Sequence, residues 1–267
     1  MSVNAEIFCF SGTGNTSYIA RQLSELLGCN VHNFTAEELK HPSKCVIDSK
    51  ADVAIWAFPT YSWGVPPIIK GIIEKGSLQF PDNSIHIAVT SAGDDVGNLP
   101  RMFRRHIKKR NLVPGAVFSV QMPNTYVMMK GFDTDSEEVA RLKVLRSVSV
   151  VKGIAEKILN KELSPKDDII VKGRFAWFKT AIIYPWFVRN EMSPDGFHVD
   201  SNICIKCGRC GEACPMDNIT YNNEGAPVWG ENCAFCTACY HICPVHAINW
   251  EKATLNKRQV KIFSSKR

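Results

Sequence analysis

The sequence predicts an α/β fold, with a doubly wound parallel sheet joined to a small α+β domain. Two observations support this prediction. Apolar runs with strand character alternate with helical patterns through residues 1–160, as in a parallel sheet covered by helices on both faces. Eight of the 11 cysteines fall between Cys204 and Cys243, which marks residues 196–250 as a separate cysteine-rich unit.

The first half contains four segments with the pattern of buried strands. Nearly continuous apolar runs of this length are typical of parallel strands covered on both faces. They are Ala5–Phe10, Ala51–Phe58, Ile85–Val89 and Ala116–Met122. Between and after them, apolar residues recur at helical spacing over 15–27, 66–75, 95–110 and 136–160.

Residues 161–195 break this alternation. They contain three prolines and a cluster of aromatic side chains between Phe175 and Phe187. The favoured interpretation is a connector whose aromatic residues wedge between the two halves. The alternative is a membrane-surface anchor with Arg174, Lys179 and Arg189 at its edges. The remaining residues, 251–267, form a basic tail.

Composition narrows the class of protein. A chain of 267 residues that is 45% hydrophobic and 22% charged has ample material for a packed core. No run of 18 apolar residues and no secretion signal are present, so we expect a cytoplasmic protein with reduced thiols and no membrane span. The net charge of +6 is spread along the chain, which argues against nucleic-acid binding.

The cysteines follow one spacing twice. Three cysteines are separated by two residues each, and a fourth follows after three residues and precedes a proline. This run is typical of [4Fe-4S] coordination, in which the fourth cysteine ligates the other cluster. The predicted sets are Cys204, Cys207, Cys210 and Cys243 for one cluster, and Cys233, Cys236, Cys239 and Cys214 for the other.

The competing interpretation of these cysteines is zinc. A zinc site commonly uses two well-separated CxxC pairs, whereas here a third cysteine follows each pair after two more residues. The spacing therefore favours clusters. Residues 196–250 resemble a bacterial-type ferredoxin with two [4Fe-4S] clusters, and the resemblance covers all eight ligands.

The first predicted strand leads into a glycine- and hydroxyl-rich loop that opens a helix. The loop consists of Ser11, Gly12, Thr13, Gly14, Asn15 and Thr16. Backbone N–H groups at the positive end of a helix dipole bind anions well. The loop lacks the lysine of a Walker motif and the third glycine of the dinucleotide motif. A phosphate monoester held by neutral donors is therefore predicted, with an ordinary strand–helix turn as the alternative.

This loop resembles the phosphate-binding fingerprint of flavodoxins, which bind FMN. The resemblance covers about residues 1–160. It implies a five-stranded parallel sheet in the order 2-1-3-4-5, with FMN at the carboxyl edge of the sheet.

The resemblance also implies that loops after later strands lie near the flavin ring. One contains Pro59, Thr60, Tyr61, Ser62, Trp63 and Gly64, another contains Ser91, Ala92, Gly93 and Asp94, and a third wall is expected from Pro123, Asn124, Thr125 and Tyr126. Tyr61 or Trp63 is expected to flank the ring, and backbone amides near Gly64 and Gly93 to meet its polar edge. The alternative is that these aromatic side chains plug the sheet edge.

The whole chain resembles flavodoxin–ferredoxin fusion proteins. The resemblance implies an electron-transfer protein that relays electrons between two [4Fe-4S] clusters and FMN, and to or from a redox protein that acts as donor or acceptor. The rival interpretation is a flavin-dependent reductase of a small-molecule substrate.

A basic helix face that includes Arg101 and Lys108 is interpreted as solvated surface, with a docking patch as the alternative. The sequence leaves a homodimer open.

Overall fold

A five-stranded parallel sheet forms the centre of the larger half of the molecule. The structure, a computed structural model, describes residues 3–260. The strands lie in the order β2-β1-β4-β6-β7. They are β1 (Ala5–Cys9), β2 (Asn30–Asn33), β4 (Val53–Pro59), β6 (Ile85–Ala92) and β7 (Val113–Gln121). Counted within this sheet alone, the order is 2-1-3-4-5, which confirms the predicted flavodoxin-like fold class.

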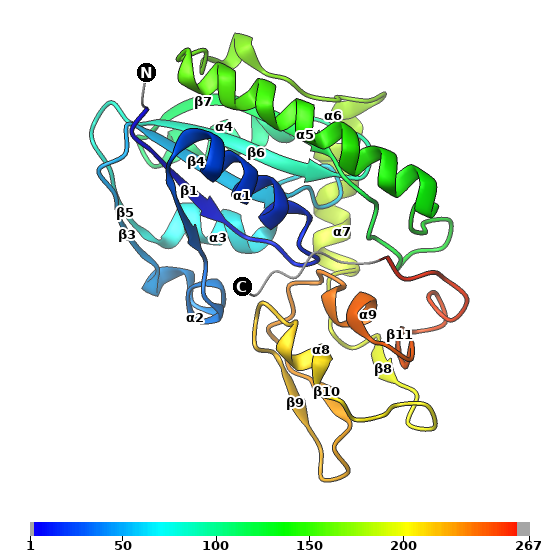
Figure 1. Cartoon of the computed structure of the whole chain (residues 1–267). Helices are drawn as coiled ribbons and strands as arrows, with labels where there is room; N and C mark the ends of the chain where they lie inside the picture. Colours follow the sequence, from blue (N-terminus) through cyan, green and yellow to red (C-terminus); the bar gives the residue numbers. More distant parts are fainter. Residues whose placement is uncertain (1–2, 261–267) are drawn as a thin grey trace.

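Helices cover both faces of this sheet (Figure 1). The helices α1 (Asn15–Leu27) and α5 (Glu137–Leu159) cover one face, and α3 (Pro67–Lys75) and α4 (Leu99–Lys109) cover the other. Successive strand residues point to opposite faces. Ile7 therefore packs in the core beneath α1 and α5, whereas the adjacent Phe8 packs in the core beneath α3 and α4.

Smaller elements flank one edge of the sheet. A capping box at Thr35 starts the short helix α2 (Ala36–Lys40), where Glu38 accepts a hydrogen bond from the Thr35 backbone. A 3-10 turn, η1 (Pro42–Lys44), follows it. The strands β3 (Val46–Asp48) and β5 (Ser77–Gln79) form a separate parallel pair. These elements cover the edge near β2 (Figure 1).

The connector is an irregular helical segment. A 3-10 turn, η2 (Pro165–Asp167), precedes α6 (Ala176–Phe178), a π-helical turn η3 (Lys179–Ile183) and α7 (Tyr184–Asn190). Its inner face joins both halves, because Tyr184 belongs to the core beneath α3 and α4 while Phe187 belongs to the core of the cysteine-rich half. Among the described residues, no helix is both long enough and apolar enough to cross a bilayer.

The cysteine-rich half is built from two short antiparallel pairs and two short helices. β8 (Phe197–Val199) pairs with β11 (Ile248–Trp250), and β9 (Ile219–Tyr221) pairs with β10 (Pro227–Trp229). α8 (Arg209–Glu212) and α9 (Ala238–Ile242) follow the two cysteine loops. The core of this half is rich in aromatic side chains: the Phe235 ring lies edge-on to the Trp250 ring, with centroids 4.8 Å apart.

The described part of the C-terminal tail packs across both halves. Lys257 Nζ donates to the carbonyl oxygens of Val127 (2.5 Å) and Met129 (2.6 Å), in the loop after β7. Gln259 Nε2 donates to the Cys243 carbonyl oxygen at 2.9 Å. The last part of the predicted basic tail, residues 261–267, lies outside the described residues.

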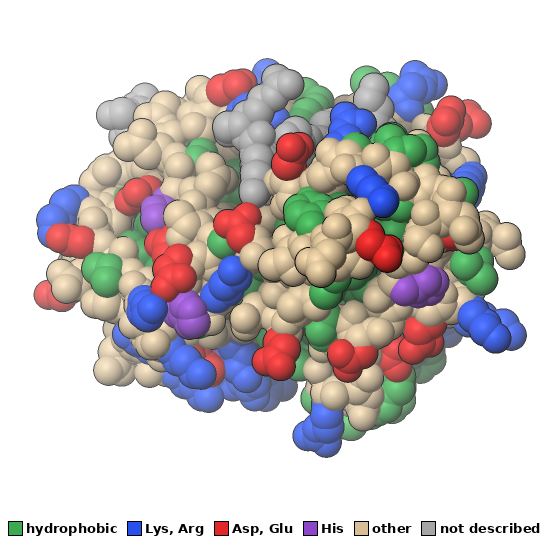
Figure 2. Space-filling view, turned by 90° about the horizontal axis from the view of Figure 1, so that it is seen from below, with side chains coloured by type: hydrophobic (Ala, Val, Ile, Leu, Met, Phe, Trp, Pro, Cys, Tyr) green, Lys and Arg blue, Asp and Glu red, His purple; other side chains and the backbone are tan. Residues whose placement is uncertain are grey.

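One surface of the molecule carries charges of both signs. Figure 2, which views the molecule from below, shows acidic and basic side chains interspersed, with Lys and Arg gathered along the lower left edge. Hydrophobic side chains appear among them in small groups.

Candidate functional site

A cavity of about 420 Å³ lies at the carboxyl edge of the parallel sheet. The loops after β1, β4, β6 and β7 form most of its wall, as expected for a doubly wound sheet. The residues predicted for the cofactor site line this cavity, with two exceptions. They are Ser11, Gly12, Thr13, Asn15, Thr16, Pro59, Thr60, Tyr61, Ser62, Trp63, Ser91, Ala92, Gly93, Asp94, Asn124 and Tyr126.

The exceptions, Gly14 and Gly64, have structural roles beside the cavity. Gly14 adopts a left-handed conformation (φ 92°) at the start of α1, which glycine reaches without strain. Gly64 N–H donates to the Tyr61 carbonyl oxygen at 2.8 Å, and the Tyr184 ring lies 2.3 Å from where a Cβ atom would stand. The Gly64 N–H therefore closes a turn, and the contact of amides near Gly64 with the flavin edge stays a prediction.

Hydrogen bonds fix the loop from Ser11 to Thr16, called the phosphate loop after its predicted role, in the wall of the cavity. Gly14 N–H donates to Ser11 Oγ at 3.1 Å, Thr16 and Ser91 share a hydrogen bond of 2.8 Å, and Asn15 Nδ2 donates to the Pro123 carbonyl oxygen at 2.9 Å. No side chain caps the first turn of α1. Its N–H groups and the neighbouring hydroxyls form a neutral donor set that fits a phosphate group.

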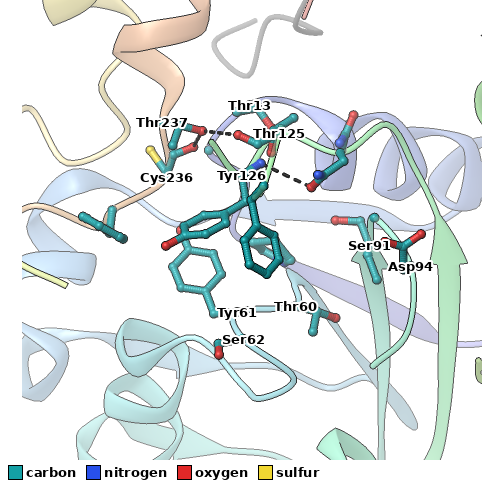
Figure 3. Close-up of a pocket in the computed structure, with 18 of the residues that line it drawn as sticks. Thr13, Thr60, Tyr61, Ser62, Ser91, Asp94, Thr125, Tyr126, Cys236 and Thr237 are labelled. Atoms are coloured by element: carbon teal, nitrogen blue, oxygen red, sulfur yellow. Dashed lines mark hydrogen bonds between the residues drawn. The ribbon is translucent and has the colours of Figure 1, made fainter. Parts of the chain in front are cut away.

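Aromatic and apolar side chains line the other end of the cavity. Figure 3 shows the phenol rings of Tyr61 and Tyr126 next to each other, away from Ser91 and Asp94. The Lys179 Nζ atom lies over the Trp63 ring, 4.9 Å from the ring centroid. A polar end and an aromatic end in one cavity fit the phosphate and the ring system of a flavin mononucleotide.

The sequence did not predict the part of the cavity wall that comes from outside the sheet loops. These additional lining residues are Ile183, Trp186, Phe187, Phe235, Cys236 and Thr237. The loops after β6 and β7 also contribute Asp95, Pro123, Thr125, Met129 and Phe132, of which Pro123 and Thr125 belong to the predicted third wall. Two groups matter most: the connector supplies Ile183 and Trp186, and the second cysteine loop supplies Cys236 and Thr237. The aromatic excess of the connector was the available signal for the first group.

The first predicted cysteine set comes together around a small cavity. Cys204, Cys207, Cys210 and Cys243 line the same space of about 20 Å³. Cys243 comes from the second repeat, so this space is lined by cysteines of both repeats. Cys207 is exposed, which places this set near the surface.

The second set is more deeply buried. Burial raises the pKa of the Cys233 thiol to about 11, and it raises the pKa values of Cys236 and Cys239 well above the usual range. The negative charge of Cys214 adds to each of these increases, so this thiol of the first repeat lies among the three of the second. Such thiols are protonated at neutral pH unless a metal binds them.

The two cysteine loops have the same backbone conformation. Positive φ recurs at equivalent positions, in Lys206 (54°) and Phe235 (56°), and again in Gly208 (76°) and Thr237 (62°).

The sulfur of each fourth cysteine also accepts an equivalent hydrogen bond. Asn218 N–H donates to Cys214 Sγ at 3.4 Å, and Ala247 N–H donates to Cys243 Sγ at 3.2 Å. Amides directed at sulfur fit cluster ligands, whose potential depends on such bonds. Among the described residues, no three His, Cys, Asp or Glu side chains gather at a single-ion site.

The second cysteine set adjoins the large cavity. Cys236 lines the cavity, and a Cβ atom on Gly12 of the phosphate loop would lie 2.3 Å from its Cβ and 3.0 Å from its Sγ. Figure 3 shows Cys236 and Thr237 on the opposite side of the cavity from Ser91 and Asp94. We call the Cys214, Cys233, Cys236 and Cys239 set proximal, and the Cys204, Cys207, Cys210 and Cys243 set distal.

Hydrogen bonds hold the second cysteine repeat against the loops that form the cavity wall. Tyr61 Oη donates to the carbonyl oxygen of Ala234, between two proximal cysteines, at 3.0 Å. Thr237 Oγ1 donates to the Thr125 carbonyl oxygen at 3.1 Å (Figure 3). Val260 N–H donates to His241 Nδ1 at 3.2 Å, so the proton on Nε2 is available for the Thr125 carbonyl oxygen at 2.8 Å.

The fold and the cysteine geometry define a flavodoxin-like sheet joined to a ferredoxin-like iron–sulfur segment. Residues 197–250 match the 4Fe-4S dicluster domain family. Over 53 residues the chain is 38% identical to a ferredoxin of Pyrobaculum islandicum (strain DSM 4184 / JCM 9189 / GEO3), a match that covers 19% of this chain and 49% of the ferredoxin. The chain thus spans about half the length of this curated relative. These findings and the sheet order confirm the resemblance to flavodoxin–ferredoxin fusions.

Solved structures similar to the first half are distant. A flavodoxin of Streptococcus pneumoniae TIGR4 has 20% sequence identity and a TM-score of 0.34, and the match covers 59% of this chain and 98% of the flavodoxin. An NAD(P)H:quinone oxidoreductase of Methanothermobacter marburgensis has 11% identity and a TM-score of 0.36, with coverage of 58% and 98%. The fold assignment rests on the strand order of this chain rather than on these similarities.

Proposed function

We propose that this chain is an electron-transfer iron–sulfur flavoprotein, which relays electrons between two [4Fe-4S] clusters and FMN, and to or from an external redox partner. The observation that carries the proposal is the position of Cys236, a proximal cysteine in the wall of the predicted flavin cavity. In this proposal FMN, when bound, supplies a centre that exchanges one or two electrons, whereas each cluster exchanges one.

Each part of the chain has a role in this proposal. The loop from Ser11 to Thr16 holds the phosphate, and Tyr61 and Tyr126 flank the ring and exclude water. The proximal cysteines keep their cluster against this loop. An external partner exchanges electrons at the distal set, a role that the exposure of Cys207 supports.

The proposal divides the chain into four parts with different roles. Residues 1–160 form the FMN-binding domain, 161–195 the connector, 196–250 the two-cluster domain and 251–267 the tail. A cytoplasmic location belongs to it as well, because cluster thiols must stay reduced.

Anaerobic purification with iron, sulfide and flavin analysis tests the cofactors. We expect about eight irons, about eight sulfides and about one FMN per chain. Cys233→Ala should lower the iron content, whereas Cys29→Ala, outside both cysteine sets, should leave it unchanged. Full iron without flavin would remove the flavin half of the proposal.

Rapid mixing with a ferredoxin-type reductant tests the relay. Cys207→Ala should slow flavin reduction, since it removes a distal ligand that does not itself line the flavin cavity. The matched control is again Cys29→Ala. Unchanged flavin reduction in Cys207→Ala would count against transfer through the distal set.

A second candidate function is a flavin-dependent reductase of a small substrate. Apolar side chains from the loop after β7 and from the connector, among them Met129, Phe132 and Trp186, extend the cavity wall and favour this alternative. A screen of small acceptors with dithionite as reductant separates the two, because a carrier reduces redox proteins but turns over no small substrate.

A further inference from the structure

The outer face of the connector is unusually apolar for a water-exposed surface. Phe175 is 73% exposed, Trp177 62% and Phe178 50%. Ile182 and Trp186 continue the same face at 48% and 47% exposure. We call these five residues the connector ridge. Contiguous exposed apolar side chains of this size mark an interaction surface.

Contacts on the inner face of the connector keep the connector ridge turned toward solvent. Tyr184 Oη donates to the Val65 carbonyl oxygen at 2.6 Å, and Thr180 Oγ1 donates to the Trp63 carbonyl oxygen at 2.8 Å. Both side chains are buried, as is Ala176. Because the inner face is packed and hydrogen-bonded, the segment cannot turn to bury the connector ridge without breaking these contacts. The wedge predicted from the sequence accounts for one face only.

The charged side chains of the connector around the ridge are all basic. Residues 169–190 contain Lys172, Arg174, Lys179 and Arg189, and neither Asp nor Glu. Lys179 is neutralised within the fold, because its Nζ lies 2.7 Å from Asp95. Within residues 3–260, the other three cations take part in no described ion pair. The connector ridge is therefore flanked by basic side chains that have no ion-pair partner among the described residues.

We propose that the connector ridge docks onto the surface of an anionic lipid bilayer. Large aromatic side chains beside Lys and Arg are the composition of segments that lie in the plane of a membrane interface. A second copy of the chain is a poorer occupant, since two such ridges would bring like charges together. The helical part of the segment, residues 176–190, is shorter than a bilayer span and, in this proposal, lies on the bilayer.

This docking would place the large cavity beside the lipid. Trp186 belongs to the connector ridge and also lines the cavity, as does Ile183 of the same segment. The rim of the cavity would then lie at the bilayer surface, while the exposed Cys207 of the distal set belongs to the other half of the molecule. This inference rests on the exposed face and does not require the proposed relay.

Vesicle flotation of the anaerobically purified full chain tests the proposal. The vesicles contain phosphatidylcholine with about 30% phosphatidylglycerol, or phosphatidylcholine alone. We expect the wild-type protein to float with the anionic vesicles and much less with the neutral ones. Trp177→Ala combined with Phe178→Ala should weaken anionic binding at least about tenfold, because it removes two of the largest exposed side chains. Neither residue lines the cavity.

The matched control replaces exposed apolar residues elsewhere. Leu145 and Val148 on α5 are 56% and 48% exposed, and Leu145→Ala combined with Val148→Ala should float like the wild type. The visible spectrum of each variant checks that the fold and cofactors are retained. Wild-type protein that stays at the bottom of the gradient, or a Trp177/Phe178 variant that floats equally well, would overturn the proposal.

Charge and self-association supply two further outcomes. Arg174→Gln combined with Arg189→Gln should reduce binding to anionic vesicles, and salt should do the same to the wild type. Binding that is equal on neutral vesicles and insensitive to salt would contradict the role given to the basic residues. A dimer that Trp177→Ala and Phe178→Ala convert to a monomer, without flotation of the wild type, would assign the ridge to a second copy instead.

Discussion

Gly12 lies where the phosphate loop meets the proximal cysteine loop. A Cβ atom on Gly12 would stand 2.3 Å from Cys236 Cβ, 3.0 Å from its Sγ and 3.3 Å from its carbonyl oxygen. Carbon atoms in contact are separated by at least about 3.5 Å, so alanine would require the two loops to move apart by about 1.2 Å. Cys236 cannot yield by changing rotamer, because its Cβ and carbonyl oxygen are fixed by the backbone.

The expected cost of Gly12→Ala follows from this clash. Forcing an extra methyl group into a packed contact destabilises a protein by about 1–3 kcal/mol. We expect the free energy of unfolding to fall by that amount, and flavin reduction from the clusters to slow, because the separation opens between the cysteine loop and the flavin cavity.

Gly153→Ala is the matched control. Gly153 lies in α5, and a Cβ atom there meets nothing within 4 Å. Since alanine favours a helix over glycine by about 0.5–1 kcal/mol, this variant should be as stable as the wild type or more so. Anaerobic denaturant titration measures the stability and rapid mixing the flavin reduction. A Gly12→Ala protein that matches the wild type in both would refute the packing argument.

Two further predictions concern single side chains. Tyr61→Phe should lower the free energy of unfolding by about 0.5–1.5 kcal/mol, because it removes the hydrogen bond to the Ala234 carbonyl oxygen, and unchanged urea denaturation would contradict this. Burial lowers the pKa of His86 to about 4, from about 6.5 in the unfolded chain. Because the unfolded state then binds more protons, the free energy of unfolding falls as the pH decreases from about 6.5 toward 4. Between pH 7.5 and 5.5 the loss should be about 1.3 kcal/mol, and denaturation of His86→Gln over the same range should lack this contribution.

The sequence predicted most of the sheet because buried parallel strands carry an obvious apolar signal. The runs at β1, β4, β6 and β7 were identified, with small differences at their ends. β2 (Asn30–Asn33) was not identified from its own residues. It is an edge strand with half-buried and exposed positions, so no apolar run marks it, and only the family resemblance implied a fifth strand.

The candidate site was predictable where local sequence creates it. Loops at the carboxyl ends of parallel strands converge by topology, and this explains why Ser11, Thr60 and Ser91 line one cavity. The contribution of Cys236 and Trp186 was not predictable, because it depends on how residues more than 100 positions apart in the chain pack together. His241 shows the same limit, since its partner Thr125 lies in the other half.

Lys257 and Gln259 connect the loop after β7 to the second cysteine repeat. Together with the Tyr61 and Thr237 hydrogen bonds, they bind the two halves together in the way a permanent complex does. Separate carrier proteins must meet by diffusion, so their exchange depends on concentration and ionic strength. In this chain the two halves are already in contact. The rate of electron transfer between them should therefore be first order, independent of dilution and insensitive to salt.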